Sequence, residues 1–204
     1  MPKRSGILFV TLGAVLMMSA LLLFLYNGWE TRKAGQAAES LLAGVQSAIE
    51  DAAQPEASLD PEMPTRMIDG YEYIGYVSIP SLELELPVMA EWDYSRLKVA
   101  PCRHFGSSRT DDLVIAAHNY KTHFGALSAL EIGAEVRFTD MDGVEIHYTL
   151  SELETLSPDA VDAVQNSGHD LVLYTCTSSG ATRVAAFCDR VQEGPERGTY
   201  RWID

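Results

Sequence analysis

Basic residues are scarce in this chain of 204 residues, which contains 15 Lys and Arg against 29 Asp and Glu and has a formal net charge of −14. Lys3 and Arg4 precede the first apolar segment, so the remainder of the chain is more acidic still. An acidic surface repels phosphate groups. The composition therefore argues against nucleic acid or anionic lipid as a partner, and it favours a soluble domain beside a charged envelope.

Cysteine is also scarce, with only Cys102, Cys176 and Cys188. An odd number leaves at least one thiol unpaired, and in an exported protein such a thiol is a candidate reactive group. The sequence does not determine the distance that a disulfide requires, so a bond between Cys102 and Cys188 stays open.

Long uncharged runs are limited to one, from Gly6 to Tyr26. A helix of this length spans a hydrocarbon core of about 30 Å. The run is longer than the apolar region of a cleaved signal peptide, and no small-residue cleavage site follows it. We therefore predict an uncleaved transmembrane anchor at 6–26 in the cell membrane, a cytoplasmic N-terminus at 1–5 that carries Lys3 and Arg4, and an external C-terminal domain.

Residues 27–70 are predicted to form a stalk that holds the following domain away from the bilayer. The part at 34–54 is rich in Ala and has apolar residues at a spacing of three to four, which is typical of an amphipathic helix. Packing of this helix on the domain is the alternative. The part at 55–64 contains three prolines and three acidic residues, which indicates an extended linker.

From Tyr71 to Asp204 the sequence predicts a domain of short strands with few helices, a pattern typical of a closed or nearly closed β-barrel. Asp142-Gly143 is a strong hairpin signal. Short helical pieces are expected at 94–98, 124–130 and 158–165. Strands are expected at 73–79, 82–88, 113–117, 134–138, 144–150, 171–177 and 183–191.

Three chemically distinct side chains lie at the ends of these strands. Cys176 ends the apolar run LVLYTC, His118 follows LVIAA, and Arg183 begins the strand after the cysteine. A thiolate nucleophile, an imidazole that carries protons and a guanidinium that stabilises negative charge are what acyl transfer through a thioester requires. We therefore predict Cys176 as nucleophile, His118 as acid/base and Arg183 as oxyanion or substrate stabiliser.

Other residues compete for these roles. His123 lies five residues after His118, and Arg190 lies seven residues after Arg183. Asn119 invites a Cys-His-Asn triad, but adjacent residues on a strand point to opposite faces, so it is not expected to orient His118. A buried structural role is the alternative for Cys176.

Thr175-Cys176, His118-Asn119 followed by Phe124 and Leu127, and Arg183 together resemble the sortase family over about 71–191. The resemblance implies a mainly β fold with an eight-stranded barrel and an extracellular cysteine transpeptidase of the Gram-positive cell wall. Such an enzyme cleaves an LPxTG-like C-terminal sorting signal of surface or pilin proteins through a thioacyl-enzyme. It then joins the product to an amine of a cell-wall precursor or to a pilin lysine.

The chain departs from the family pattern at two points. Ala117 stands where the family usually has Gly, and the turn between Cys176 and Arg183 is short, so one wall of the groove is expected to be narrow. The spacing between His118 and Cys176 favours a compact class D or class B-like enzyme. No lid segment before Tyr71 and no C-terminal anchor are evident, which favours surface-protein anchoring over pilin polymerisation.

Other functions stay open at this point. A cysteine peptidoglycan hydrolase, an L,D-transpeptidase and a non-catalytic membrane-tethered barrel are the alternatives. No cofactor is expected, and calcium, which some members of the resembled family bind, is the weakly supported alternative. Asp140-Met141-Asp142-Gly143 resembles the start of a calcium loop but lacks the later ligands and the closing Glu.

Overall fold

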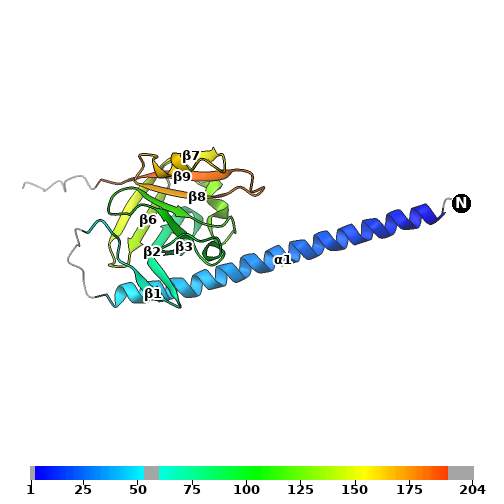
Figure 1. Ribbon diagram of the computed structural model, residues 1–204, viewed down its shortest axis with the longest axis horizontal. Helices are drawn as coiled ribbons and strands as arrows, with labels where there is room; N and C mark the ends of the chain where they lie inside the picture. Colours follow the sequence, from blue (N-terminus) through cyan, green and yellow to red (C-terminus); the bar gives the residue numbers. More distant parts are fainter. Residues whose placement is uncertain (1–2, 53–59, 193–204) are drawn as a thin grey trace, which may run out of the picture.

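One long helix and a β-barrel make up the protein in a computed structural model that describes residues 3–52 and 60–192 (Figure 1). Much of the predicted linker and the last residues of the predicted domain lie outside the described residues. The elements are α1 (Lys3–Glu50), β1 (Arg66–Ile68), β2 (Tyr71–Ile79), the 3₁₀ helix η1 (Pro80–Leu82), β3 (Leu84–Met89), η2 (Arg96–Lys98), β4 (Cys102–Phe105), β5 (Leu113–Ala116), η3 (Phe124–Ala129), β6 (Glu135–Asp140), β7 (Glu145–Leu156), α2 (Val161–Gln165), β8 (Leu171–Cys176) and β9 (Arg183–Arg190).

The strands follow the order β1-β2-β3-β4-β5-β8-β9-β7-β6, and β2 also pairs with β6. This second pairing closes eight strands, β2 to β9, into a barrel and leaves β1 as an addition to β2. Gly75 permits the closure, because a Cβ at this position, with its φ of +143°, would lie 1.9 Å from the carbonyl oxygen of Thr139 on β6. The predicted closed, mainly β, eight-stranded barrel is confirmed.

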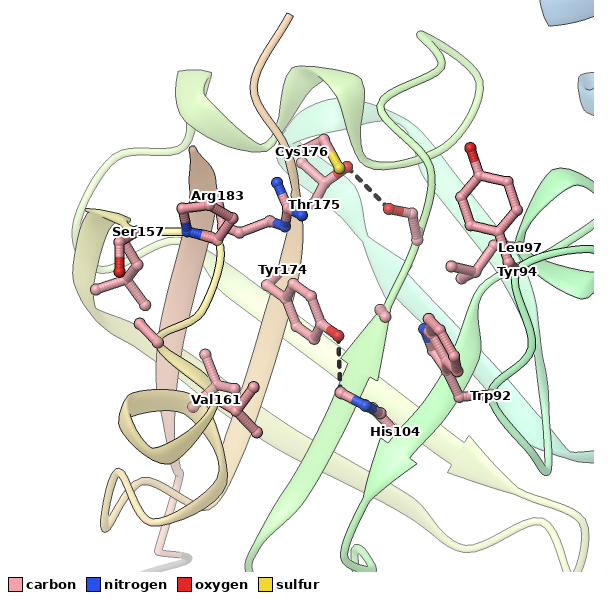
Figure 2. Close-up of a pocket in the computed structure, with 16 residues that line it drawn as sticks. Trp92, Tyr94, Leu97, His104, Ser157, Val161, Tyr174, Thr175, Cys176 and Arg183 are labelled. Carbon is pink, nitrogen blue, oxygen red and sulfur yellow. Dashed lines mark hydrogen bonds between the residues drawn. The ribbon is translucent and has the colours of Figure 1, made fainter. Parts of the chain in front are cut away.

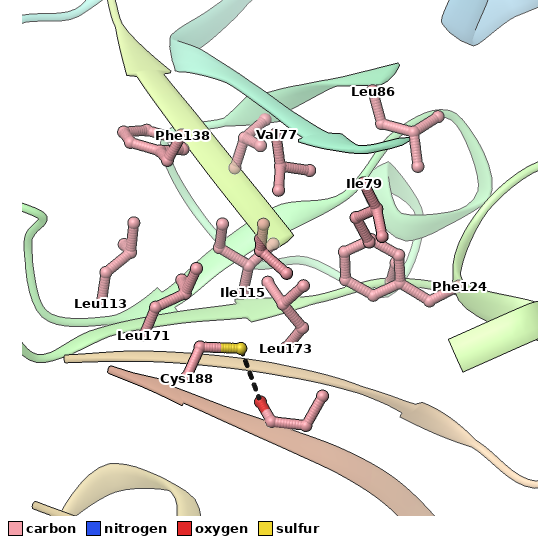
Figure 3. Close-up of a cluster of buried hydrophobic side chains, with 14 of the residues drawn as sticks. Val77, Ile79, Leu86, Leu113, Ile115, Phe124, Phe138, Leu171, Leu173 and Cys188 are labelled. Atoms are coloured by element: carbon pink, nitrogen blue, oxygen red, sulfur yellow. Dashed lines mark hydrogen bonds between the residues drawn. The ribbon is translucent and has the colours of Figure 1, made fainter. Parts of the chain in front are cut away.

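Strands β5 and β8 pair in parallel and are rich in apolar residues, as expected of strands that are covered on both faces. On the outer face of these two strands, Val114 and Val172 pack in one cluster with Val164 of α2. On the inner face, these two strands contribute to the barrel core Leu113, Ile115, Leu171 and Leu173 (Figure 3).

The observed strands differ most from the predicted ones at β3, β7, β1 and β4. Strand β3 begins two residues late, because η1 forms first and Glu83 takes a left-handed φ of 53°. Strand β7 continues to Leu156, since a bulge between Leu150 and Glu152 lets it keep pairing with β9. Neither β1 nor β4 was predicted, because both are short and β4 combines polar and apolar residues.

Helix α1 runs without interruption from the apolar segment through the predicted stalk (Figure 1). Its C-terminal part buries one stripe at the helical spacing of three to four residues, formed by Ala34, Ala38, Leu41 and Val45. Leu41 and Val45 belong to a cluster with Tyr73 and Met89 of the barrel. The alternative that this helix packs on the domain is therefore the observed one, and over this stretch the helix is not a spacer.

Replacing Val45 by Ala should lower the free energy of unfolding of the full chain by about 2 kcal/mol, because two fully buried methyl groups are lost and a cavity remains. Urea unfolding in detergent micelles, followed by circular dichroism, measures the change. Ser47→Ala is the matched control, since Ser47 is exposed two residues further along the same helix. Equal stability of the Val45→Ala variant and the unaltered chain would contradict this packing.

Candidate active site

His118 and Cys176 stand at corresponding positions after β5 and at the end of β8, because hydrogen bonding between the two segments continues past the last paired strand residues. The ladder pairs Ala116 with Tyr174. Beyond it, Thr175 Oγ1 donates a hydrogen bond of 2.9 Å to the carbonyl oxygen of Ala117. The next position along each segment is His118 in the one and Cys176 in the other.

Asn119 holds the two segments together on the far side of this pair. Its Nδ2 atom donates a hydrogen bond of 3.1 Å to the carbonyl oxygen of Thr177. The side chain thus joins the segment that follows β5 to the segment that follows β8, one residue beyond His118 and one residue beyond Cys176. Sequence reasoning assigned no role to Asn119, and the observed role is to align the two strand ends.

Arg183 faces Cys176 across the antiparallel pair of β8 and β9, in which the two residues are in direct register. Directly opposed residues project their side chains from the same face. The guanidinium extends toward the Cys176 end of β8 (Figure 2). Its Nη1 atom donates to the carbonyl oxygens of Gly180 at 3.2 Å and Thr182 at 3.1 Å, which ties it to the short turn between the strands.

A pocket of about 270 Å³ leads to Cys176 and Arg183 along the outer face of β5 and β8. Trp92, Tyr94 and Leu97 form one wall, and residues of the β7–α2 connection and α2 form the other (Figure 2). Its lining is predominantly apolar and comprises Trp92, Tyr94, Leu97, His104, Ala116, Ala117, Leu156, Ser157, Pro158, Ala160, Val161, Val164, Tyr174, Thr175, Cys176 and Arg183.

His104 and Tyr174 place a polar pair within this apolar pocket. The hydroxyl oxygen of Tyr174 lies 2.7 Å from His104 Nδ1 (Figure 2). Burial lowers the pKa of His104 and raises the pKa of Tyr174 to about 12, so both side chains favour the neutral form. His104 was not among the residues singled out from the sequence. The alternation of Tyr174 with Cys176 along β8 is the signal that could have identified the tyrosine.

The ring of His118 borders the pocket at Tyr94, with 5.9 Å between the ring centroids, and is stacked on Tyr120 at 4.6 Å. Burial is the main influence on its pKa and lowers it, while Asn119 and Glu30 act in the opposite direction. Its Nε2 atom is buried and has no hydrogen-bond partner within 3–52 and 60–192. The neutral imidazole is thus favoured.

The rival residues occupy different places. His123 is fully buried and therefore has no access to solvent. Burial lowers its pKa to about 4, so it does not change protonation state near neutral pH. Arg190 stands at the opposite end of β9 and pairs with Asp111 at 2.8 Å. Seven strand residues separate it from Arg183, or about 23 Å.

The three cysteines are all free, so the possible disulfide between Cys102 and Cys188 does not form. Cys102 packs between α1 and the barrel, whereas Cys188 lies in the barrel core. Burial raises the pKa of each of these two thiols to about 12. Cys176 is partly exposed at the end of β8, which matches the predicted placement at a strand's edge.

The Asp140–Gly143 segment forms a hairpin turn in which the carboxylate of Asp140 is already engaged. Its Oδ1 atom accepts hydrogen bonds from the backbone amides of Asp142 at 2.9 Å and Val144 at 3.0 Å. Its Oδ2 atom accepts one from Arg109 at 3.0 Å. The segment thus forms the hairpin turn that the sequence predicts.

The barrel carries a thiol, an imidazole and a guanidinium at its rim. Comparison with known families identifies the class of protein to which it belongs. The family model described as the sortase domain matches residues 77–191, more than half of the chain, and the chain therefore belongs to the sortase family. Sortase A of Bacillus anthracis is 27% identical over 123 residues. This match covers 57% of the chain but only 58% of the length of that relative.

Solved sortase structures share the fold at low sequence identity. Sortase A from Corynebacterium diphtheriae is similar with a TM-score of 0.55 and 17% identity, over 87% of this chain and 98% of that one. Sortase C of Streptococcus pneumoniae, described for its catalysis and pilin substrate specificity, is similar with a TM-score of 0.53 and 21% identity, over 80% and 89% of the two chains.

Iodoacetamide at pH 8 should modify Cys176 in the native full chain and leave Cys102 and Cys188 unmodified. The latter two are buried, and their raised pKa values of about 12 keep them protonated at this pH. Peptide mapping by mass spectrometry identifies the modified residues, and unfolding in urea should expose all three as the control. Labelling of Cys102 or Cys188 at the rate of Cys176 would contradict this assignment.

Proposed function

We propose that the protein is a membrane-anchored cysteine transpeptidase that cleaves the C-terminal sorting signal of surface proteins and transfers the acyl part to an amine. The observation that carries this proposal is the strand register, which brings the positions of Cys176, His118 and Arg183 to the same rim of β5, β8 and β9. Membership of the sortase family supports it.

In the proposed reaction, Cys176 is the nucleophile. Its sulfur attacks the carbonyl carbon of the scissile peptide bond as the thiol proton passes to His118, and Arg183 with a backbone amide stabilises the oxyanion that forms. His118 gives its proton to the leaving nitrogen as the carbon–nitrogen bond breaks. A thioester between the substrate and Cys176 and a free amine on the released peptide are the products of this step.

The second half of the reaction reverses these roles. An acceptor amine attacks the thioester carbonyl, and His118 takes up the proton that the amine loses. The carbon–sulfur bond breaks and returns the Cys176 thiolate. One amide bond is exchanged for another, so that the cycle needs no oxidant, reductant or cofactor. A cell-wall precursor is the proposed source of the amine, and a pilin lysine is the alternative.

The pocket supports recognition of an extended peptide with an apolar side chain ahead of the scissile bond. Its walls offer Trp92 and Leu97 on one side and Val161 on the other, and its end reaches Cys176. Among the described residues, none before Trp92 lines the pocket. An open groove of this kind supports anchoring of surface proteins, with an LPxTG-like signal, over pilin polymerisation.

The apolar part of α1 supports the proposed membrane anchor. From Gly6 the helix has the length and composition needed to cross a bilayer. Its large apolar side chains up to Trp29 are more than half exposed, and only an apolar surrounding compensates such exposure. With the N-terminus inside the cell, the barrel lies outside, where sorting signals and cell-wall precursors are found.

The full chain in detergent micelles, mixed with a panel of sorting-signal peptides, should form a thioacyl adduct on Cys176. Mass spectrometry detects the adduct, and an added amine should convert it into the transpeptidated product. Cys176→Ala should abolish both species, and His118→Ala should slow the reaction by about 10²- to 10⁴-fold, because proton transfer is lost. His147→Ala is the matched control, since His147 lies on β7 away from the rim.

Absence of an adduct with every peptide, in a chain whose Cys176 reacts with iodoacetamide, would argue against transpeptidation. A peptide that binds the pocket without any covalent step would then favour the non-catalytic barrel. Binding in that case should survive the Cys176→Ala replacement.

Replacing Arg183 by Ala should lower kcat by about 10²- to 10³-fold, the effect of removing one donor to an oxyanion. Arg190→Ala is the control on the same strand, since Arg190 pairs with Asp111 at the far end of β9. Steady-state kinetics with the best peptide measure both variants. An equal loss in the two variants would indicate that Arg183 acts only through the stability of the barrel.

A further inference from the structure

Helix α1 contacts the segment that follows His118. The hydroxyl of Tyr120 donates a hydrogen bond of 3.2 Å to Glu30 Oε1, and Thr122 Oγ1 donates one of 3.3 Å to the carbonyl oxygen of Thr31. A Cβ on Gly35, one helical turn further along, would lie 2.7 Å from the Thr122 side chain. The helix and the segment 120–122 therefore fit closely along more than one turn.

Tyr120 in turn contacts the ring of His118. The two rings are stacked, with 4.6 Å between their centroids and 17° between their planes. An acid/base histidine is usually oriented by a third group that is hydrogen-bonded to its second nitrogen. The side chain of Asn119 is hydrogen-bonded to His118, and Nε2 of His118 has no partner in the described part of the chain, so the stack on Tyr120 is a second contact that orients the ring.

We propose that Glu30 is a positioning residue that holds the ring of His118 through Tyr120, so that α1 forms part of the catalytic apparatus. The proposal rests on the proposed function, in which His118 is the acid/base. Without the bond to Glu30, the Tyr120 side chain loses the partner that sets its orientation. The ring stacked on it then samples orientations that do not face the scissile bond.

The charges around His118 support a second effect of Glu30. The carboxylate raises the pKa of His118, whereas Lys98 of η2 lowers it. The charge of His118 in turn lowers the pKa of His123. Cys176 and Arg183 are paired at the ends of the neighbouring strands β8 and β9. Loss of the Glu30 charge should therefore move the titration of His118 to lower pH.

The test uses the full chain in detergent micelles with Glu30→Ala, Glu30→Gln, Tyr120→Phe and the double variant Glu30→Ala/Tyr120→Phe. Glu30→Ala and Tyr120→Phe should each lower kcat about three- to tenfold, the effect of one hydrogen bond, with little change in KM. The double variant should lose no more than either single one, because both remove the same bond. Glu30→Gln should restore part of kcat, since its amide oxygen still accepts the bond.

The pH dependence of iodoacetamide labelling at Cys176 gives a readout that needs no peptide substrate. In Glu30→Gln and Glu30→Ala, the part of the labelling-rate profile that reports the titration of His118 should move to lower pH. In a His118→Ala background the Glu30 replacements should produce no shift. Glu39→Gln is the control, because Glu39 is an exposed carboxylate on the same helix, nine residues after Glu30.

Wild-type kcat and an unshifted labelling profile in the Glu30 and Tyr120 variants would overturn the positioning role. A shift that persists in the His118→Ala background would overturn it as well, since the effect would then bypass His118. If the labelling profile shifts in a protein that forms no peptide adduct, the coupling between Glu30 and His118 is supported and the proposed transpeptidase function is refuted.

Discussion

The parallel pairing of β5 with β8 is the interaction on which the proposed site depends. Parallel strands require a crossover, and the connection from His118 to Leu171 here contains η3, β6, β7 and α2. The imidazole and the thiol of Cys176 can therefore meet only when most of the barrel has formed. Bonds from Thr175 and Asn119 extend the alignment past the ladder and hold the two side chains at the rim.

Helix α1 adds a second constraint, because it connects the apolar segment to this rim. Glu30 lies four residues after Tyr26, or about 6 Å along the helix axis, and it reaches Tyr120 directly. If α1 anchors the chain as proposed, the rim lies close to the bilayer surface instead of at the end of a stalk. A sorting signal that is followed by its own membrane segment would then present its cleavage site at the same height.

Much of the barrel could be predicted from the sequence, because strands covered on both faces read as continuous apolar runs. The same feature located the proposed catalytic residues, since Cys176 and His118 each follow such a run and Arg183 opens the next strand. Strand β4 was not predictable in this way. Its four residues mix Cys102 with polar neighbours, and a bulge interrupts its pairing with β5.

The contact between α1 and the site lies beyond sequence reasoning for a different reason. The spacing of Ala38, Leu41 and Val45 predicts an apolar face, which requires some partner surface but does not identify it. That surface exists only after the barrel closes and brings Tyr73 and Met89 together from separate parts of the chain. Docking of the apolar face aligns the helix on the barrel. The barrel residue that each polar residue beside this face contacts, Glu30 included, is therefore decided only by the closed fold.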